Sequence, residues 1–198
     1  MKRISFKDSD GLCLTQAVLS GRKTMTRRAV IEQVERDAMV YAGGKSEFTR
    51  VKFEYILKHS PYKVGEIVAI QQAYKDIPAV IVSSSYDCRK LDTTAGWTNK
   101  MFVKAELMPH HIRIADVRVE RLQDISDEDC MREGVICDDV PFVEDNFHII
   151  PTRYIKHSRG NYWATPSEAF AALIDKVSGR GTWDSNPLVW AYSFELVD

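Results

Sequence analysis

The feature of this sequence that most constrains its fold is an alternating run of apolar and polar residues at positions 111–120. Its apolar side chains fall on even positions as far as Ile114 and on odd positions from Val117 onward. Alternation with a period of two is typical of a β-strand with one buried face, and the parity cannot change without an extra residue. The run therefore predicts a long strand with a β-bulge at Ala115 and Asp116.

Other segments with the pattern of strands lie on both sides of this run. Positions 188–197 alternate again and predict a closing strand, in which Trp190 belongs to the core. The apolar run at 67–70 has no polar face, which is typical of a strand buried on both sides. Shorter strands are predicted at positions 4–6, 77–82 and 101–103. Since bulged strands are common in small closed barrels, we predict a barrel of five to six strands.

Capping signals mark the helices that accompany these strands. Ser126 precedes a run of acidic residues, which predicts a helix over 127–133 that ends at Gly134. A capping box at 165–168, with proline at the first helical position, begins a second helix that ends at Gly179. The chain is therefore expected to be of the α+β class, with helices flanking a small mixed barrel.

Two stretches do not fit a minimal domain. Positions 29–62 combine two short helical patterns, separated by Gly43 and Gly44, and predict an irregular, partly helical arm. Positions 136–164 contain prolines and scattered aromatic residues and predict a long loop. A chain of 198 residues, 44% of them hydrophobic, can bury one good core, so we predict a single domain over 1–198 with these two elaborations.

Composition argues against several classes of protein. A net charge of −1 is unlike proteins whose whole surface binds duplex nucleic acid, since those carry a clear basic excess. No stretch approaches the ~18 consecutive apolar residues of a membrane span, and the first residues lack the apolar run of a signal peptide. We expect a soluble cytoplasmic protein with free thiols, because no cysteines form a C-x-x-C pair. The cysteines are Cys13, Cys88, Cys130 and Cys137.

The candidate functional segment is residues 21–28, which hold four cations and two hydroxyls just after an amphipathic helical pattern. Gly21 is placed to end that helix in a left-handed conformation, so the residues after it are expected to be extended. In an extended chain Lys23 lies on one face, and Thr26 and Arg28 lie on the other. Lys23 and Thr26 therefore meet only where the backbone bends.

The spacing Gly-x-Lys-x-x-Thr-x-Arg in this segment resembles the signature of the ASCH family, small β-barrel domains related to the PUA RNA-binding fold. The resemblance extends to positions 64–66, 117–135 and 181–187, and the last of these is similar to longer members from phage and bacteria. It implies a PUA-like barrel that recognises RNA, a nucleotide or a nucleoside in a basic pocket. The elaborations at 29–62 and 136–164 lie outside the resemblance.

Some family members that match this signature are amidohydrolases that remove the acyl group from N4-acetylcytidine with a lysine, a threonine and a glutamate. By motif these are Lys23, Thr26 and Glu133. A threonine hydroxyl is a weak nucleophile that needs a base, and a lysine serves as one only when its pKa falls well below ~10.4. Burial and neighbouring cations both lower a lysine pKa. Glu133, at a helix end, is placed to protonate the leaving amine.

Ligand contacts are predicted for Gly21, Arg22 and Arg28 in the basic segment, and for Trp163, whose ring offers a stacking platform for a base. Arg28 is also suited to bind a phosphate or a developing oxyanion. No spacing of histidines, cysteines or acids matches a known metal site, so we predict neither a metal nor another cofactor.

Simpler roles for these residues stay open. Lys23 and Arg28 are equally explained by phosphate binding or by ion pairs with Glu66 or Asp116, and Glu133 by a solvated helix end. Recognition of RNA, a nucleotide or a nucleoside is the leading hypothesis, and hydrolysis of an acylated cytidine is the alternative. A protein-interaction module that uses the long loop is a third. No feature of the sequence indicates an oligomeric state.

Overall fold

A mixed five-stranded sheet lies at the centre of the protein and confirms the predicted α+β class. The computed structural model describes residues 1–8, 11–43, 50–77, 91–138, 143–144, 148–149, 153–155 and 162–197. The strands of the sheet are β1 (Arg3–Ile4), β2 (Met25–Ala29), β3 (Ile67–Ile70), β4 (His111–Arg121) and β10 (Leu188–Leu196). Within the described ranges their order is β1-β3-β4-β10-β2, so β1 and β2 are the two edges. β1 is parallel to β3, and the other neighbours are antiparallel.

The long strand β4 contains the predicted bulge. Opposite it on β10, Ser193 pairs with Asp116 and Phe194 pairs with Ile114, so Ala115 is the extra residue. Trp190 of β10 is only 1% exposed, which confirms its assignment to the core. The two alternating runs of the sequence are therefore the two longest strands, and they lie side by side.

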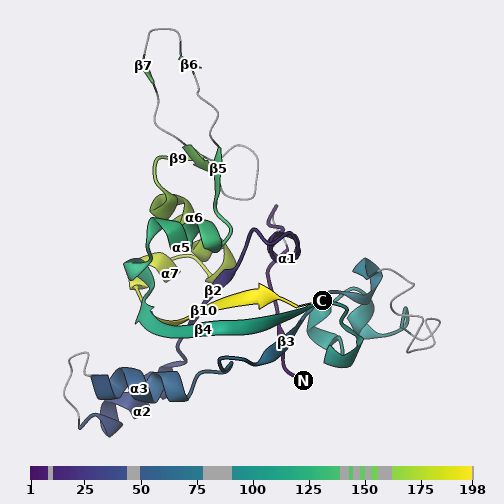
Figure 1. The fold of residues 1–198 in the computed structure, drawn as a ribbon, viewed down its shortest axis with the longest axis horizontal. Coiled ribbons are helices and arrows are strands. Elements are labelled where there is room, and N and C mark those ends of the chain that lie inside the picture. Colours follow the sequence, from purple (N-terminus) through teal and green to yellow (C-terminus); the bar gives the residue numbers. More distant parts are fainter. Residues whose placement is uncertain are drawn as a thin grey trace.

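Helices cover both sides of this sheet (Figure 1). They are α1 (Leu14–Leu19), α2 (Glu32–Tyr41), α3 (Arg50–Lys58), α5 (Asp127–Arg132), α6 (Pro166–Ser178) and α7 (Thr182–Ser185). Figure 1 shows α1, α5, α6 and α7 on one side, and α2 with α3 on the other. Both predicted N-caps are confirmed, because the Ser126 and Thr165 hydroxyls accept hydrogen bonds from Asp129 and Glu168 amides, each at 3.2 Å. None of these helices has the length and hydrophobicity of a transmembrane segment.

The predicted arm at 29–62 contains the expected helices, α2 and α3, and its described part packs against the sheet. Ile56 of α3 is fully buried, and its carbonyl accepts a hydrogen bond from the Trp190 indole at 3.0 Å. The Ser60 and Tyr192 hydroxyls lie 2.7 Å apart. These contacts make the helix pair part of the main core.

A second hydrophobic cluster adjoins β3 and is built largely from short 3-10 helices. These are η1 (Tyr74–Asp76), η3 (Ala95–Trp97), η4 (Lys100–Phe102) and η5 (Ala105–Leu107); a further one, η6 (Leu122–Asp124), follows β4. The strand predicted at 101–103 is wrong, because the Asn99 side chain accepts a hydrogen bond from the Met101 amide at 3.0 Å and closes a helical turn. Apart from Ile77, the strand predicted at 77–82 lies outside the described residues.

The prediction of a long loop at 136–164 is wrong for the parts that the structure describes. β5 (Ile136–Asp138), β8 (Arg153–Ile155) and β9 (Tyr162–Trp163) form a three-stranded antiparallel sheet, and β6 (Val143–Glu144) pairs with β7 (His148–Ile149). Figure 1 shows β6 and β7 far from the five-stranded sheet. Strands of two or three residues are too short to show a period, so their pairing leaves no pattern in the sequence.

Candidate functional site

The segment at 21–28 turns at Gly21 and meets the end of α5 before it becomes extended in β2. Gly21 has a φ of +73° and ends α1, and the Lys23 amide then donates to the Ala17 carbonyl at 2.9 Å. One residue later, the Thr24 amide donates to the Arg132 carbonyl at 2.9 Å. The bend therefore holds Lys23 beside the last turn of α5, before β2 begins.

Lys23 and Glu133 form a buried ion pair. The Lys23 ammonium lies 2.6 Å from Glu133 Oε2 and also donates to the Glu133 carbonyl at 2.8 Å. Their side chains are 3% and 5% exposed. Burial lowers the pKa of Lys23, the Glu133 carboxylate opposes this, and the cations of Arg28 and Arg27 add to the lowering, so that the pKa lies below 10.5.

Arg27 joins this pair to two further acids. Its guanidinium nitrogens lie 2.6 Å from Glu120, 3.0 Å from Asp129 and 3.3 Å from Glu133. We call these four residues, together with Lys23, the inner cluster. Sequence reasoning treated Arg27 only as a neighbouring cation and missed its three partners. The available signal was the spacing of Lys23 and Arg27, which places both on one face of an extended segment. In the structure both contact Glu133.

Four predicted site residues line one small space, which we call the inner cavity. They are Lys23, Thr26, Arg28 and Glu133. The volume is about 20 Å³, and the remaining wall is largely apolar, with Phe6, Leu14 and side chains of α6. A water molecule needs roughly 10–15 Å³ of such space. The inner cavity as it stands therefore accommodates a water molecule and no nucleobase.

The Arg28 side chain also lines a second, much larger opening next to the inner cavity. Its guanidinium donates to the Ser5 carbonyl at 2.5 Å and lies 5.9 Å from the centroid of the Phe6 ring. The Lys23 ammonium lies 5.9 Å from the same ring. Glu66, the proposed alternative partner of these cations, instead pairs with Lys2 at 2.9 Å. The Phe6 ring is thus close to both the buried Lys23 ammonium and the half-buried Arg28 guanidinium.

The larger opening is a cleft of about 640 Å³, within the roughly 300–1,000 Å³ of small-molecule sites. We refer to it as the cleft. Four cations line it: Lys7, Arg28, Lys75 and Lys100. Two acids, Asp8 and Asp76, also line it, so the described charged residues give an excess of two positive charges. Lys7 and Arg28 line both the cleft and the inner cavity, which makes the two spaces neighbours.

The other predicted ligand residues lie elsewhere. Gly21 and Arg22 are exposed in the turn after α1, and Trp163 is half-buried on β9 against the main core. None of the three lines the inner cavity or the cleft. Sequence reasoning in turn missed three cleft cations, Lys7, Lys75 and Lys100, because they come from segments distant in the chain and belong to no motif.

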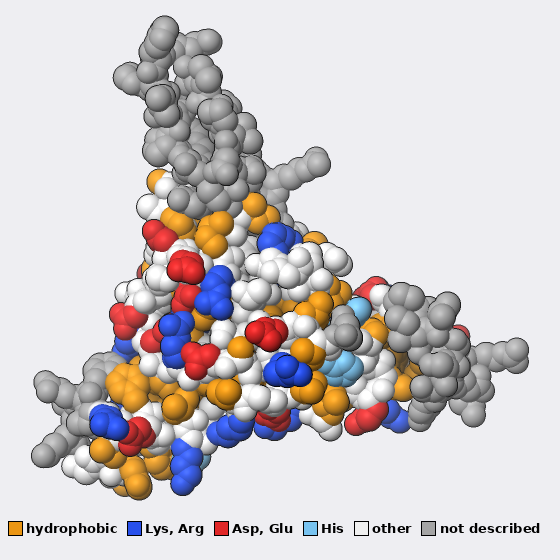
Figure 2. Space-filling model, in the orientation of Figure 1, with side chains coloured by type: hydrophobic (Ala, Val, Ile, Leu, Met, Phe, Trp, Pro, Cys, Tyr) orange, Lys and Arg blue, Asp and Glu red, His pale blue; other side chains and the backbone are white. Residues whose placement is uncertain are grey.

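Charge on the described surface is mixed. Figure 2 shows acidic and basic side chains side by side on one face, with no extended basic patch. Within the described ranges, no group of three histidines, cysteines or acids is arranged to hold a metal ion. Contact with a polyanion on this face would therefore have to be local.

Comparison with known proteins adds no relative. No family model matches the chain, and neither a curated protein nor a solved structure is significantly similar to it.

Proposed function

We propose that this protein binds a nucleotide, a nucleoside or an exposed nucleotide of RNA in the cleft. The observation that carries the proposal is the position of Arg28 and Lys7, which line both the inner cavity and the cleft. A phosphate in the cleft meets ammonium and guanidinium groups that are strong donors to anionic oxygens. The volume of about 640 Å³ suits a small ligand.

Two further observations support a local site. The net charge of −1 and the mixed surface of Figure 2 disfavour binding along an extended nucleic acid. The resemblance of residues 21–28 to the ASCH signature points to the same ligands, and we include a PUA-like arrangement of the sheet in the proposal. The mixed five-stranded sheet, with β3, β4 and β10 at its centre, supports this part of the proposal.

The experiment is a titration with cytidine 5′-monophosphate and with a short single-stranded RNA, by calorimetry at low and at raised salt. We expect Arg28→Gln to weaken binding about tenfold, because the substitution removes a charged protein group that donates hydrogen bonds to the ligand. Arg36→Gln is the matched control, since Arg36 is an exposed arginine of α2 paired with Glu32 in the same helix. Equal affinities of the native protein and Arg28→Gln would reject the cleft as the binding site.

A second candidate function, hydrolysis of N4-acetylcytidine, is favoured by the 2.6 Å contact between Lys23 and Glu133 next to Thr26. In this scheme the Thr26 hydroxyl attacks the acetyl carbonyl carbon while a neutral Lys23 amine accepts the hydroxyl proton. The bond to the N4 nitrogen breaks, the Glu133 carboxylate passes to this nitrogen the proton that Lys23 has accepted, and an acetyl ester remains on Thr26. Water then cleaves the ester to acetate and restores the hydroxyl.

The size of the inner cavity sets a condition on this chemistry. At about 20 Å³ it does not hold an acetyl group, so hydrolysis requires the Phe6 ring or α6 to move away from Thr26. The lowered pKa of Lys23 works in favour of this chemistry, because burial shifts the side chain toward the neutral amine that a base needs. Binding in the cleft requires no such movement, and this is why we rank it first.

Incubation with N4-acetylcytidine and chromatography of the products test the second candidate. Lys23→Met, Thr26→Val and Glu133→Gln should each abolish release of cytidine, whereas Thr24→Val, two residues away, should retain it. The rate should rise with pH through a midpoint below 10.5, the ordinary value for lysine, because only the neutral amine accepts the proton. Cytidine release that persists in Thr26→Val would exclude this scheme.

A further inference from the structure

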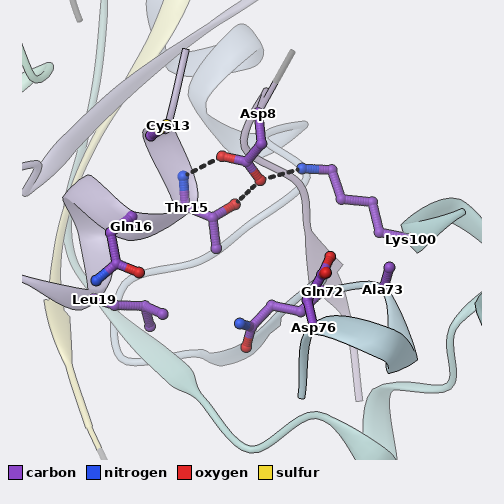
Figure 3. A pocket seen from close by; sticks show the side chains of 9 residues that line it. All are labelled: Asp8, Cys13, Thr15, Gln16, Leu19, Gln72, Ala73, Asp76 and Lys100. Carbon is purple, nitrogen blue, oxygen red and sulfur yellow. Dashed lines mark hydrogen bonds and ion pairs between the residues drawn. The ribbon is translucent and has the colours of Figure 1, made fainter. Parts of the chain in front are cut away.

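A third space lies beside α1 and is lined by Thr15, Gln16 and Leu19 of that helix (Figure 3). We call it the α1 cavity. It measures about 240 Å³ and lies between α1 and η1. Its polar lining comes from Asp8, Thr15, Gln16, Gln72, Asp76 and Lys100, and its apolar lining includes Leu19 and Ala73. This volume is below the roughly 300–1,000 Å³ of whole-ligand pockets, so it suits one ring or group of a larger ligand.

The hydrogen-bonding groups on one side of the α1 cavity are already occupied. The Asp8 carboxylate accepts from the Thr15 amide at 2.8 Å, from the Thr15 hydroxyl at 2.5 Å and from the Lys100 ammonium at 2.8 Å. Figure 3 shows this set of contacts at the end of the cavity where α1 begins. These residues therefore form a fixed wall, and the amides of Gln16 and Gln72 and the carboxylate of Asp76 are left for a ligand.

Gln72 provides the decisive observation. Its Oε1 atom is buried and accepts no hydrogen bond, the one such side-chain atom among the described residues. A buried acceptor without a donor is unfavourable, and such atoms are rare in native structures. Because Oε1 accepts no hydrogen bond, the terminal amide can rotate toward the α1 cavity without breaking a hydrogen bond to this atom. A ligand with an N–H donor in this cavity would satisfy it.

The α1 cavity and the cleft are parts of one groove. They share Asp8, Ala73, Asp76 and Lys100, so a ligand can extend from one into the other. The cleft has the excess of positive charge, and the α1 cavity has two amides that each carry a donor and an acceptor. The groove thus matches a molecule with an anionic group at one end and a small ring bearing an amino group at the other.

We propose that the α1 cavity is the base subsite of the nucleotide site, where Gln72 accepts a hydrogen bond from the amino group of the base. The inference rests on the function proposed above and adds the part of the ligand that is recognised and the residue that recognises it. A glutamine amide pairs well with an amino group next to a ring acceptor, as in nucleobase recognition generally. Gln16, on the facing helix, is the second amide within the subsite.

The experiment compares two ligands that share the phosphate and differ in the base. Calorimetry gives the dissociation constants of cytidine 5′-monophosphate and ribose 5-phosphate for the native protein, Gln72→Met and Gln33→Met. Methionine keeps the shape of glutamine without its amide, and Gln33 is an exposed glutamine of α2 that serves as the control. We expect the native protein and the control to prefer cytidine 5′-monophosphate at least tenfold, about 1.4 kcal/mol. In Gln72→Met this preference should disappear, with ribose 5-phosphate bound as before.

Each result has a distinct meaning. Loss of the preference in Gln72→Met alone supports the subsite. A preference that survives in Gln72→Met, or a native protein that binds both ligands equally, overturns the subsite and leaves the cleft as a phosphate site. A native protein that binds neither ligand overturns the proposed function and this inference together. Urea unfolding verifies that Gln72→Met is folded, and we expect no loss of stability because the substitution removes an unpaired acceptor.

Discussion

The inner cluster and the cleft hold their cations in opposite ways. In the inner cluster the Arg27 side chain is 0% exposed, and three carboxylates surround it. The cleft cations border an open space of about 640 Å³, against about 20 Å³ for the inner cavity, and Lys75 is exposed. Buried charges are tolerated only with partners, whereas exposed ones stay hydrated. The same residue types therefore lie among three acids in one region and at the border of an open space in the other, where Lys75 is the most accessible to a ligand.

Arg28 shares features of both regions, because it lines the inner cavity as well as the cleft. It is next in sequence to Arg27 and is half-buried, and its guanidinium donates to the backbone carbonyl of Ser5, whereas Arg27 contacts three acids. Alternation along β2 sends neighbouring side chains to opposite faces, so one arginine enters the inner cluster and the other reaches the cleft. This comparison predicts that substitutions in the two regions differ mainly in how much they change folding.

The largest effect is expected when the inner cluster loses its shared acid. Glu133→Gln leaves both Lys23 and Arg27 with one carboxylate fewer in a buried place, and breaking such pairs costs about 3–5 kcal/mol. We expect a loss of this size in the free energy of unfolding, measured by urea denaturation. The matched variant, Lys23→Met, should cost less, because Glu133 keeps its contact with Arg27 at 3.3 Å. Equal losses in the two variants would contradict the view that Glu133 is the hub of the cluster.

A smaller effect is expected in the second hydrophobic cluster, which supports the cleft wall. A Cβ atom on Gly96 would lie 2.5 Å from Cε2 of Tyr74, and Tyr74 is fixed by its hydroxyl, which accepts from the Lys104 amide at 2.8 Å. Gly96→Ala should therefore lower the free energy of unfolding by about 1–3 kcal/mol through overpacking. Asp92→Ala, an exposed change in the same segment, is the control.

Gly96→Ala also tests whether the cleft can be altered without a change in the inner cluster. Because Tyr74 precedes Lys75 in η1, Gly96→Ala should also weaken nucleotide binding in the cleft, measured by calorimetry. The Lys23–Glu133 pair belongs to another part of the core and should keep its geometry. Unchanged binding together with reduced stability would show that the cleft wall tolerates a shift of Tyr74.

Much of the fold was predictable because its longest elements carry strong periods. The alternating run at 111–120 predicted β4 and its bulge at Ala115, and the capping residues Ser126 and Thr165 predicted two helix starts. The short strands at 136–164 and the 3-10 turn at Lys100–Phe102 were missed, since two or three residues carry no period and a side-chain cap overrides weak strand propensity.

For the candidate site, several residues could be predicted from the sequence, whereas the cavities that they line are known only from the structure. The motif brought Lys23, Thr26 and Glu133 to notice, and the structure brings them together around one cavity. Its small volume depends on how Phe6 and α6 pack, which no motif encodes. Lys75 and Gln72 belong to neither a motif nor a period, so only the folded chain identifies them as cleft and cavity residues.

The smallest effect on folding is expected in the cleft itself. Lys75→Gln removes an exposed charge, and we expect the free energy of unfolding to change by less than about 0.5 kcal/mol. Binding of cytidine 5′-monophosphate should weaken by up to about fivefold, the size of an exposed ion pair, and the difference should shrink as salt rises. Lys58→Gln, an exposed lysine of α3, is the control. If Lys75→Gln lowered stability as much as Glu133→Gln, the division between a folding cluster and a binding cleft would be wrong, because an exposed cation would then contribute to the core.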